Sequence, residues 1–152
     1  MPISHLEHFL IQTGDIERTC DWYVEVLGFR VGPAPEFQFP VKWLYLGERD
    51  VIHVCEGGQG VSENRKRYLG QQSEDLHGSG VIDHVAFRCT GLEDMVARLK
   101  AARVDYKERQ VDDQALYQLF MLDPNGVKVE LNFAAAEAEG RRAEVTAADL
   151  GA

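Results

Sequence analysis

One strand-and-helix phrase occurs twice in this chain, and this repeat constrains the fold more than any other feature. The stretch LEHFLIQTGDIER begins at Leu6, and VIDHVAFRCTGLED begins at Val81. The two align without a gap, so that His8 falls on His84. A repeat of this kind indicates two copies of one supersecondary unit.

Each copy is predicted to contain a strand, a helix, a second strand and a closing hairpin. Residues 5–56 form module one and residues 81–133 form module two. In module one, Asp15 is expected to cap a helix that ends at Gly28. In module two, Thr90 and Glu93 have the spacing of a capping box.

The segments outside the two modules are polar or rich in alanine and glutamate. Residues 57–80 are predicted to be a linker, with a short helix within SENRKRYL. Residues 1–136 then form the globular part, and residues 137–152 form a tail that is either a loosely docked helix or disordered.

The last strands of the two modules can also be aligned, and this places His53 on Glu130. Four side chains that can bind metal therefore occupy two pairs of equivalent positions. In strands, side chains alternate between faces, so His8 and His84 are expected on a mixed face that lines a cavity.

The Asp-Pro-Asn-Gly turn at residues 123–126 sets the register of the last hairpin. Counting from it places Phe120 opposite Glu130, with Gln118 beside them on the same face. A shift of one residue would put Leu119 there instead. The same count in module one places Trp43 opposite His53.

Composition excludes several function classes. The net charge of -9 argues against nucleic-acid binding and against docking on an anionic membrane. No apolar run is long enough to cross a bilayer, and no signal peptide is expected at the N-terminus. The 3 cysteines have no paired spacing, which predicts reduced thiols and a cytoplasmic protein.

These motifs resemble the vicinal oxygen chelate superfamily of glyoxalases, bleomycin resistance proteins and extradiol dioxygenases. The resemblance rests on the repeat and on LDPNGVKVELNF near the end of module two. It implies an α+β fold of two paired βαβββ modules, whose curled mixed sheets enclose a metal-binding cavity. It also implies a small-molecule substrate that binds through two oxygens, and a homodimer.

The resemblance assigns His8, His84 and Glu130 as ligands of a divalent metal ion. Two imidazoles and one carboxylate favour Fe(II), with Zn, Ni, Co or Mn as alternatives. His53 matches the acid/base histidine of the extradiol dioxygenases, although a fourth ligand and a pocket-lining residue remain open. The chain departs from those dioxygenases at Phe120, where they carry a tyrosine.

Substrate contacts are predicted for Trp43, Arg88, Gln118 and Phe120. The leading functional hypothesis is an extradiol-like dioxygenase that chelates a vicinal diol on Fe(II), with His53 as the catalytic acid/base. The alternatives are a glyoxalase-like isomerase or lyase that uses Zn, Ni or Co on a carbonyl substrate, and a non-catalytic protein that sequesters a ligand.

Overall fold

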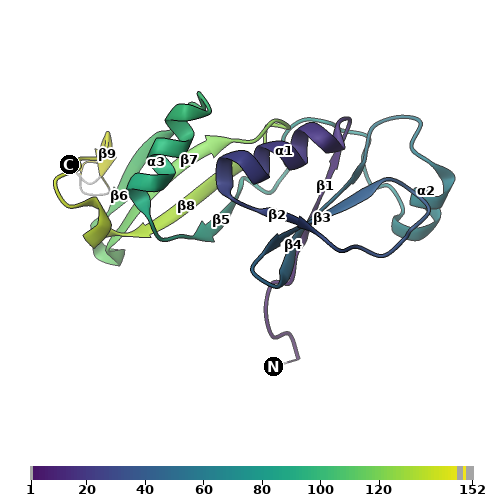
Figure 1. The fold of residues 1–152 in the computed structure, drawn as a ribbon, viewed down its shortest axis with the longest axis horizontal. Helices are drawn as coiled ribbons and strands as arrows, with labels where there is room; N and C mark the ends of the chain where they lie inside the picture. The colour runs from purple at the N-terminus through teal and green to yellow at the C-terminus, as the bar shows by residue number, and fades with distance from the viewer. Residues whose placement is uncertain (1, 147–148, 150–152) are drawn as a thin grey trace. The chain divides into compact units, whose positions relative to one another are not determined.

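The computed structural model describes residues 2–146 and residue 149, and it divides the chain into two compact units. Unit 1 covers residues 1–77 and unit 2 covers residues 78–152. Both units combine helices with one mixed sheet (Figure 1), so the predicted α+β class is confirmed.

Unit 1 follows the predicted order of elements and includes the short helix predicted within residues 57–80. Its elements are β1 (Phe9–Thr13), α1 (Ile16–Leu27), β2 (Arg30–Gly32), β3 (Val41–Leu46), β4 (Arg49–Glu56) and α2 (Glu63–Leu69). The sheet order is β1-β4-β3-β2, in which only the β1–β4 pair is parallel. Helix α1 packs against β3 and β4 and covers the apolar face of the sheet.

Unit 2 repeats this topology and extends it. Its elements are β5 (His84–Arg88), α3 (Leu92–Ala101), β6 (Lys107–Val111), η1 (Asp112–Gln114), β7 (Leu116–Leu122), β8 (Lys128–Ala134), η2 (Ala135–Ala138) and β9 (Val145–Thr146). The order is β5-β8-β7-β6-β9. The two βαβββ modules are thus confirmed, with a short strand added to the second sheet.

The helix faces and central strands of each unit form its core. In unit 1 the buried side chains include Cys20, Tyr23, Leu44, Ile52 and Val54, and in unit 2 they include Leu92, Val96, Leu99, Val129 and Leu131. No helix in the described part of the chain has the length and apolar character needed to cross a membrane.

The ends of helix α1 are as the sequence predicts. Oδ1 of Asp15 accepts a hydrogen bond from the backbone N–H of Arg18 at 3.0 Å. Gly28 ends the helix in the left-handed conformation, with φ of 83°.

The capping box predicted for α3 is wrong. Gly91, not Thr90, is the N-cap residue, and it has no side chain to accept a hydrogen bond. Glu137 takes over this role, because its Oε1 accepts from the backbone N–H groups of Gly91 at 2.7 Å and Leu92 at 3.2 Å. The cap comes from a residue 46 positions along the chain, which local sequence patterns do not reveal.

The tail prediction is also wrong for its described residues. Ala138 and Ala143 are buried, Arg141 forms ion pairs with Glu93 and Glu108, and β9 pairs in parallel with β6. Residues 137–146 are therefore part of unit 2. The rest of the predicted tail lies outside the described residues, apart from residue 149.

The predicted linker contains the expected short helix, α2, and packs on unit 1. Arg65 of α2 is 4% exposed and donates hydrogen bonds to the backbone oxygens of Glu56 and Gly70 and to Oε1 of Gln12. Gln12 in turn donates to backbone oxygens of residues 73 and 75. The segment is held by a buried cation, a role that its charged composition does not suggest.

The hairpin registers match the sequence prediction. Phe120 pairs with Glu130, and Trp43 pairs with His53. In the turn between β7 and β8, the backbone N–H of Asp123 donates to the backbone oxygen of Val127 at 2.9 Å, and Gly126 has φ of 80°. The alternative with Leu119 opposite Glu130 is excluded.

Candidate metal and substrate site

Unit 1 brings two histidines and one carboxylate together. Ligand atoms of His8, Asp50 and His53 all lie within 4.8 Å of one another. His8 lies just before β1, and the other two residues come from β4. Asp50 was not among the residues singled out from the sequence.

His53 lies between two aromatic rings. Its ring centroid is 3.7 Å from that of His8 and 4.0 Å from that of Trp43, and the His53 and Trp43 planes differ by only 3°. One face of Trp43 is therefore occupied by His53. The predicted stacking of Trp43 on a substrate stays a prediction for its other face.

A β-bulge explains why Asp50 reaches His53. Leu44 of β3 pairs with Ile52, but the next residue, Tyr45, pairs with Asp50, so β4 carries an extra residue at this point. In regular alternation, side chains three residues apart point to opposite faces. The bulge resets the alternation and puts Asp50 on the same face as His53.

The contact between Asp50 and His53 shapes the chemistry of both. Oδ2 of Asp50 lies 2.7 Å from Nε2 of His53. Burial lowers the pKa of His53 below its usual value, and the hydrogen bond with Asp50 opposes part of this shift. The same hydrogen bond lowers the pKa of Asp50. At neutral pH His53 is thus an uncharged imidazole with a carboxylate ready to stabilise its protonated form.

Unit 2 pairs the two other predicted ligands. Nε2 of His84 lies 2.9 Å from Oε2 of Glu130, whose side chain is nearly buried. Oε1 of Glu130 accepts hydrogen bonds from Nε2 of Gln118 at 2.9 Å and Nδ2 of Asn132 at 2.7 Å. The amides fix the carboxylate in place and leave Oε2 toward the imidazole.

His8 and His84, the two equivalent histidines of the repeat, each follow an acidic residue whose carboxylate contacts Nδ1 of the imidazole. Nδ1 of His8 lies 3.0 Å from Oε1 of Glu7, and Nδ1 of His84 lies 2.8 Å from Oδ2 of Asp83. A carboxylate at Nδ1 holds the proton there and leaves the Nε2 lone pair for a metal ion.

The donor set of unit 2 fits a cation. A neutral imidazole has one N–H, but His84 contacts the carboxylates of both Asp83 and Glu130. The second contact needs either another proton or a metal ion. Imidazole nitrogen and carboxylate oxygen are suitable ligands for Zn, Fe, Co or Ni.

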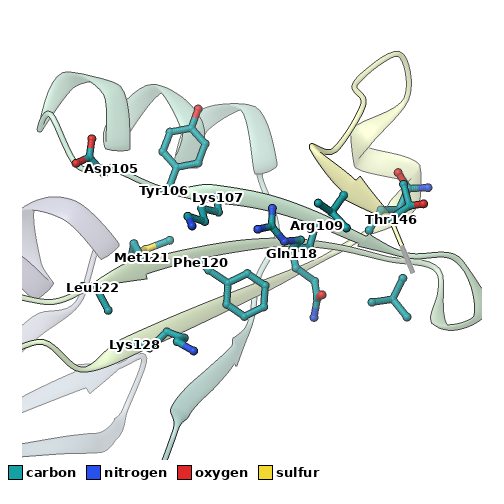
Figure 2. A pocket seen from close by; sticks show the side chains of 13 residues that line it. Asp105, Tyr106, Lys107, Arg109, Gln118, Phe120, Met121, Leu122, Lys128 and Thr146 are labelled. Carbon is teal, nitrogen blue, oxygen red and sulfur yellow. The ribbon is translucent and has the colours of Figure 1, made fainter. Parts of the chain in front are cut away.

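An open pocket of about 690 Å³ lies on the sheet of unit 2. Figure 2 shows Lys107 and Arg109 of β6 beside Phe120 and Gln118 of β7. The pocket is lined by Asp105, Tyr106, Lys107, Arg109, Gln110, Val111, Gln118, Phe120, Met121, Leu122, Lys128, Val145 and Thr146. Phe120 also connects it with the histidine, because the His84 and Phe120 rings meet edge to face with centroids 6.2 Å apart.

The predicted substrate residues differ in where they lie. Gln118 and Phe120 line the pocket of unit 2, and Trp43 lies on His53 in unit 1. Arg88 is exposed on β5 and is not among the described residues that line the pocket. A substrate contact for Arg88 stays a prediction.

Three cations at this pocket were missed from the sequence, namely Lys107, Arg109 and Lys128. A signal for two of them is present, because KERQV at residues 107–111 places the side chains of 107, 109 and 111 on one face of a strand. No comparable sequence pattern indicates the bulge in β4 that places Asp50 beside His53.

The amino-acid sequence is similar to a known protein family and to characterised relatives. The family model for the Glyoxalase/Bleomycin resistance protein/Dioxygenase superfamily matches residues 5–131. A lactoylglutathione lyase from Pseudomonas putida is 26% identical over 141 residues, which are 82% of this chain and 82% of that protein.

Solved structures share the fold at low sequence identity. An integron cassette protein from the mobile metagenome of V. cholerae has a TM-score of 0.64 and 21% identity, and the match covers 88% of this chain and 97% of that one. An antibiotic binding protein from Streptomyces sp. CB03234 has a TM-score of 0.62 and 19% identity, with 88% and 98% covered.

Proposed function

Since the chain belongs to the Glyoxalase/Bleomycin resistance protein/Dioxygenase superfamily, we propose that it is a metal-dependent lyase or isomerase of a small carbonyl compound. The observation that carries this proposal is the Asp50–His53 pair beside His8. A lyase of this kind needs a group that moves a proton, and the His53 imidazole beside the Asp50 carboxylate can fill that role.

The proposed ligands are His8, His84 and Glu130, which together bind one divalent ion, within one chain or across a homodimer. The equivalence of His8 and His84 in the repeat supports this proposal, as does the position of His84 between the carboxylates of Asp83 and Glu130. When bound, the ion would polarise a carbonyl oxygen of the substrate. Gln118 and Asn132 keep the Glu130 carboxylate oriented for that ion.

His53 is the proposed acid/base, because burial keeps its imidazole neutral at pH 7. It takes a proton from the carbon next to the carbonyl and returns a proton to the neighbouring carbon. Asp50 stabilises the imidazolium between these steps, at 2.7 Å from Nε2. Trp43 covers one face of the ring and holds its plane.

An extradiol-like dioxygenase on Fe(II) is the second candidate. The neutral imidazole of His53 favours it, since it can accept the proton of a catechol-type diol. The register of the last hairpin weighs against it, because the residue opposite Glu130 is Phe120 and brings no hydroxyl group. This is why the lyase comes first.

Metal analysis and two assays distinguish the candidates. We expect about one divalent ion per chain, and turnover of lactoylglutathione under argon by protein loaded with Zn, Ni or Co. Oxygen uptake with catechol on Fe(II), without anaerobic turnover, would put the dioxygenase first. Ligand binding without either reaction would point to a sequestering protein. A chain that takes up none of these metals would exclude both enzymes.

A further inference from the structure

Two rows of side chains cross the pocket face of the sheet in unit 2. In the first row, Lys107 of β6 pairs with Phe120 of β7, which pairs with Glu130 of β8. In the second row, Arg109 pairs with Gln118, which pairs with Asn132. Neighbouring strands are about 4.8 Å apart, so Lys107 and Glu130 lie about 10 Å apart at their Cα atoms. One small organic molecule can span that distance.

The cations on this face differ in their partners. Lys128 forms an ion pair with Asp83 at 2.9 Å, and Arg109 contacts Glu144 at 3.3 Å. Among residues 2–146 and 149, the side chain of Lys107 forms no hydrogen bond or ion pair, although its backbone pairs with Phe120 of β7. In a protein with a net charge of -9, an ammonium group left unpaired at a pocket is available for a ligand.

The rest of the pocket is suited to an apolar body. Phe120 lines it and contacts the ring of His84, and Val111 and Val145 are also lining residues. Asp105 is the carboxylate among the lining residues. The volume of about 690 Å³ is in the usual range for a small-molecule ligand.

We propose that the substrate is an organic anion, whose carboxylate binds Lys107 and Arg109 while its apolar body lies on Phe120. This inference rests on the proposed function. The substrate oxygens would bind the metal ion on the Glu130 side of Phe120, and the carboxylate would bind on the β6 side. Lys107 provides a charged contact, and Arg109 adds N–H donors in the neighbouring row.

A matched pair of inert ligands tests this inference. Catechol and 3,4-dihydroxybenzoate have the same vicinal oxygens and differ in one carboxylate. With Zn-loaded protein under argon, we expect calorimetry to show that the carboxylated ligand binds about 10- to 100-fold more tightly, as a charge-assisted hydrogen bond provides. Lys107→Gln should abolish this difference, and Lys107→Arg should restore most of it.

Lys100→Gln is the matched control, because Lys100 lies at the exposed end of α3 and is not a pocket residue. Equal binding of the two ligands, or equal losses in Lys107→Gln and Lys100→Gln, would overturn the inference. Benzoate separates it from the proposed function. If metal-free protein binds benzoate and Lys107→Gln abolishes this binding, the anion site stands even when no metal is taken up.

Discussion

The last strand of each module, β4 or β8, has the same place in its sheet but carries different side chains. His53 in unit 1 and Glu130 in unit 2 occupy equivalent strand positions, and each pairs with an aromatic residue, Trp43 or Phe120. Trp43 stacks on the imidazole, whereas Glu130 accepts two amide hydrogen bonds. The difference follows from the residue type, because a nearly buried carboxylate needs donors while an imidazole can be covered by a ring.

The next position along this face separates the modules further. In β4 the bulge places Asp50 there, whereas β8 pairs with β7 without interruption and presents Lys128. One module thus adds a carboxylate to its histidine, and the other adds a cation to its pocket. The two modules therefore share one topology and carry different side chains at these equivalent positions.

The largest expected effect comes from exchanging the two equivalent residues for alanine. Glu130→Ala should lose the metal ion, because it removes a proposed ligand. His53→Ala should keep the metal and lose about 100- to 10,000-fold in turnover, because it removes the proposed acid/base. Metal content and rate, measured on the same samples, test both expectations.

His8→Ala is the reference variant for metal loss in unit 1. If His53→Ala is as depleted in metal as His8→Ala, then His53 is a fourth ligand. The difference in role between the two equivalent strand positions would then disappear.

A smaller effect is expected from equivalent positions in the two cores. Leu44 and Met121 each follow the aromatic residue in the first strand of their hairpin, and both are buried. Leu44→Ala and Met121→Ala should each lower the free energy of unfolding by about 2–5 kcal/mol. Urea unfolding followed by circular dichroism measures this loss.

Tryptophan fluorescence shows which unit unfolds, because Trp22 and Trp43 both lie in unit 1. A loss under about 1 kcal/mol in only one variant would mean that the two cores do not contribute equally.

The smallest effect is expected at Asp50, which the β-bulge in β4 places on the same face as His53. Asp50→Asn removes the carboxylate that orients His53 and stabilises its protonated form, so turnover should fall about 10- to 100-fold with the metal retained. Lys128→Gln is the matched change in the other module, and it should leave the proton-transfer step unaffected. Equal losses of turnover in the two variants would show that Asp50 has no special role at His53.

Sequence patterns predicted those features that depend on neighbours in the chain. The Asp-Pro-Asn-Gly turn fixed the Phe120–Glu130 pair, and Asp15 and Gly28 marked the ends of α1. The features that were missed depend on partners far along the chain. Glu137 caps α3 from 46 residues away, and the extra residue in β4 becomes visible only once β3 lies beside it.

The short strand β9 has a consequence for handling the protein. Unit 1 ends its sheet with β2, which has only 3 residues and is followed by Pro33 and Pro35, so this edge offers little for another chain to join. The outer edge of β6 is longer, and β9 covers part of it. A chain shortened after Ala134 would expose that edge as a template for strand addition between molecules, and aggregation would follow at the concentrations used in crystallisation.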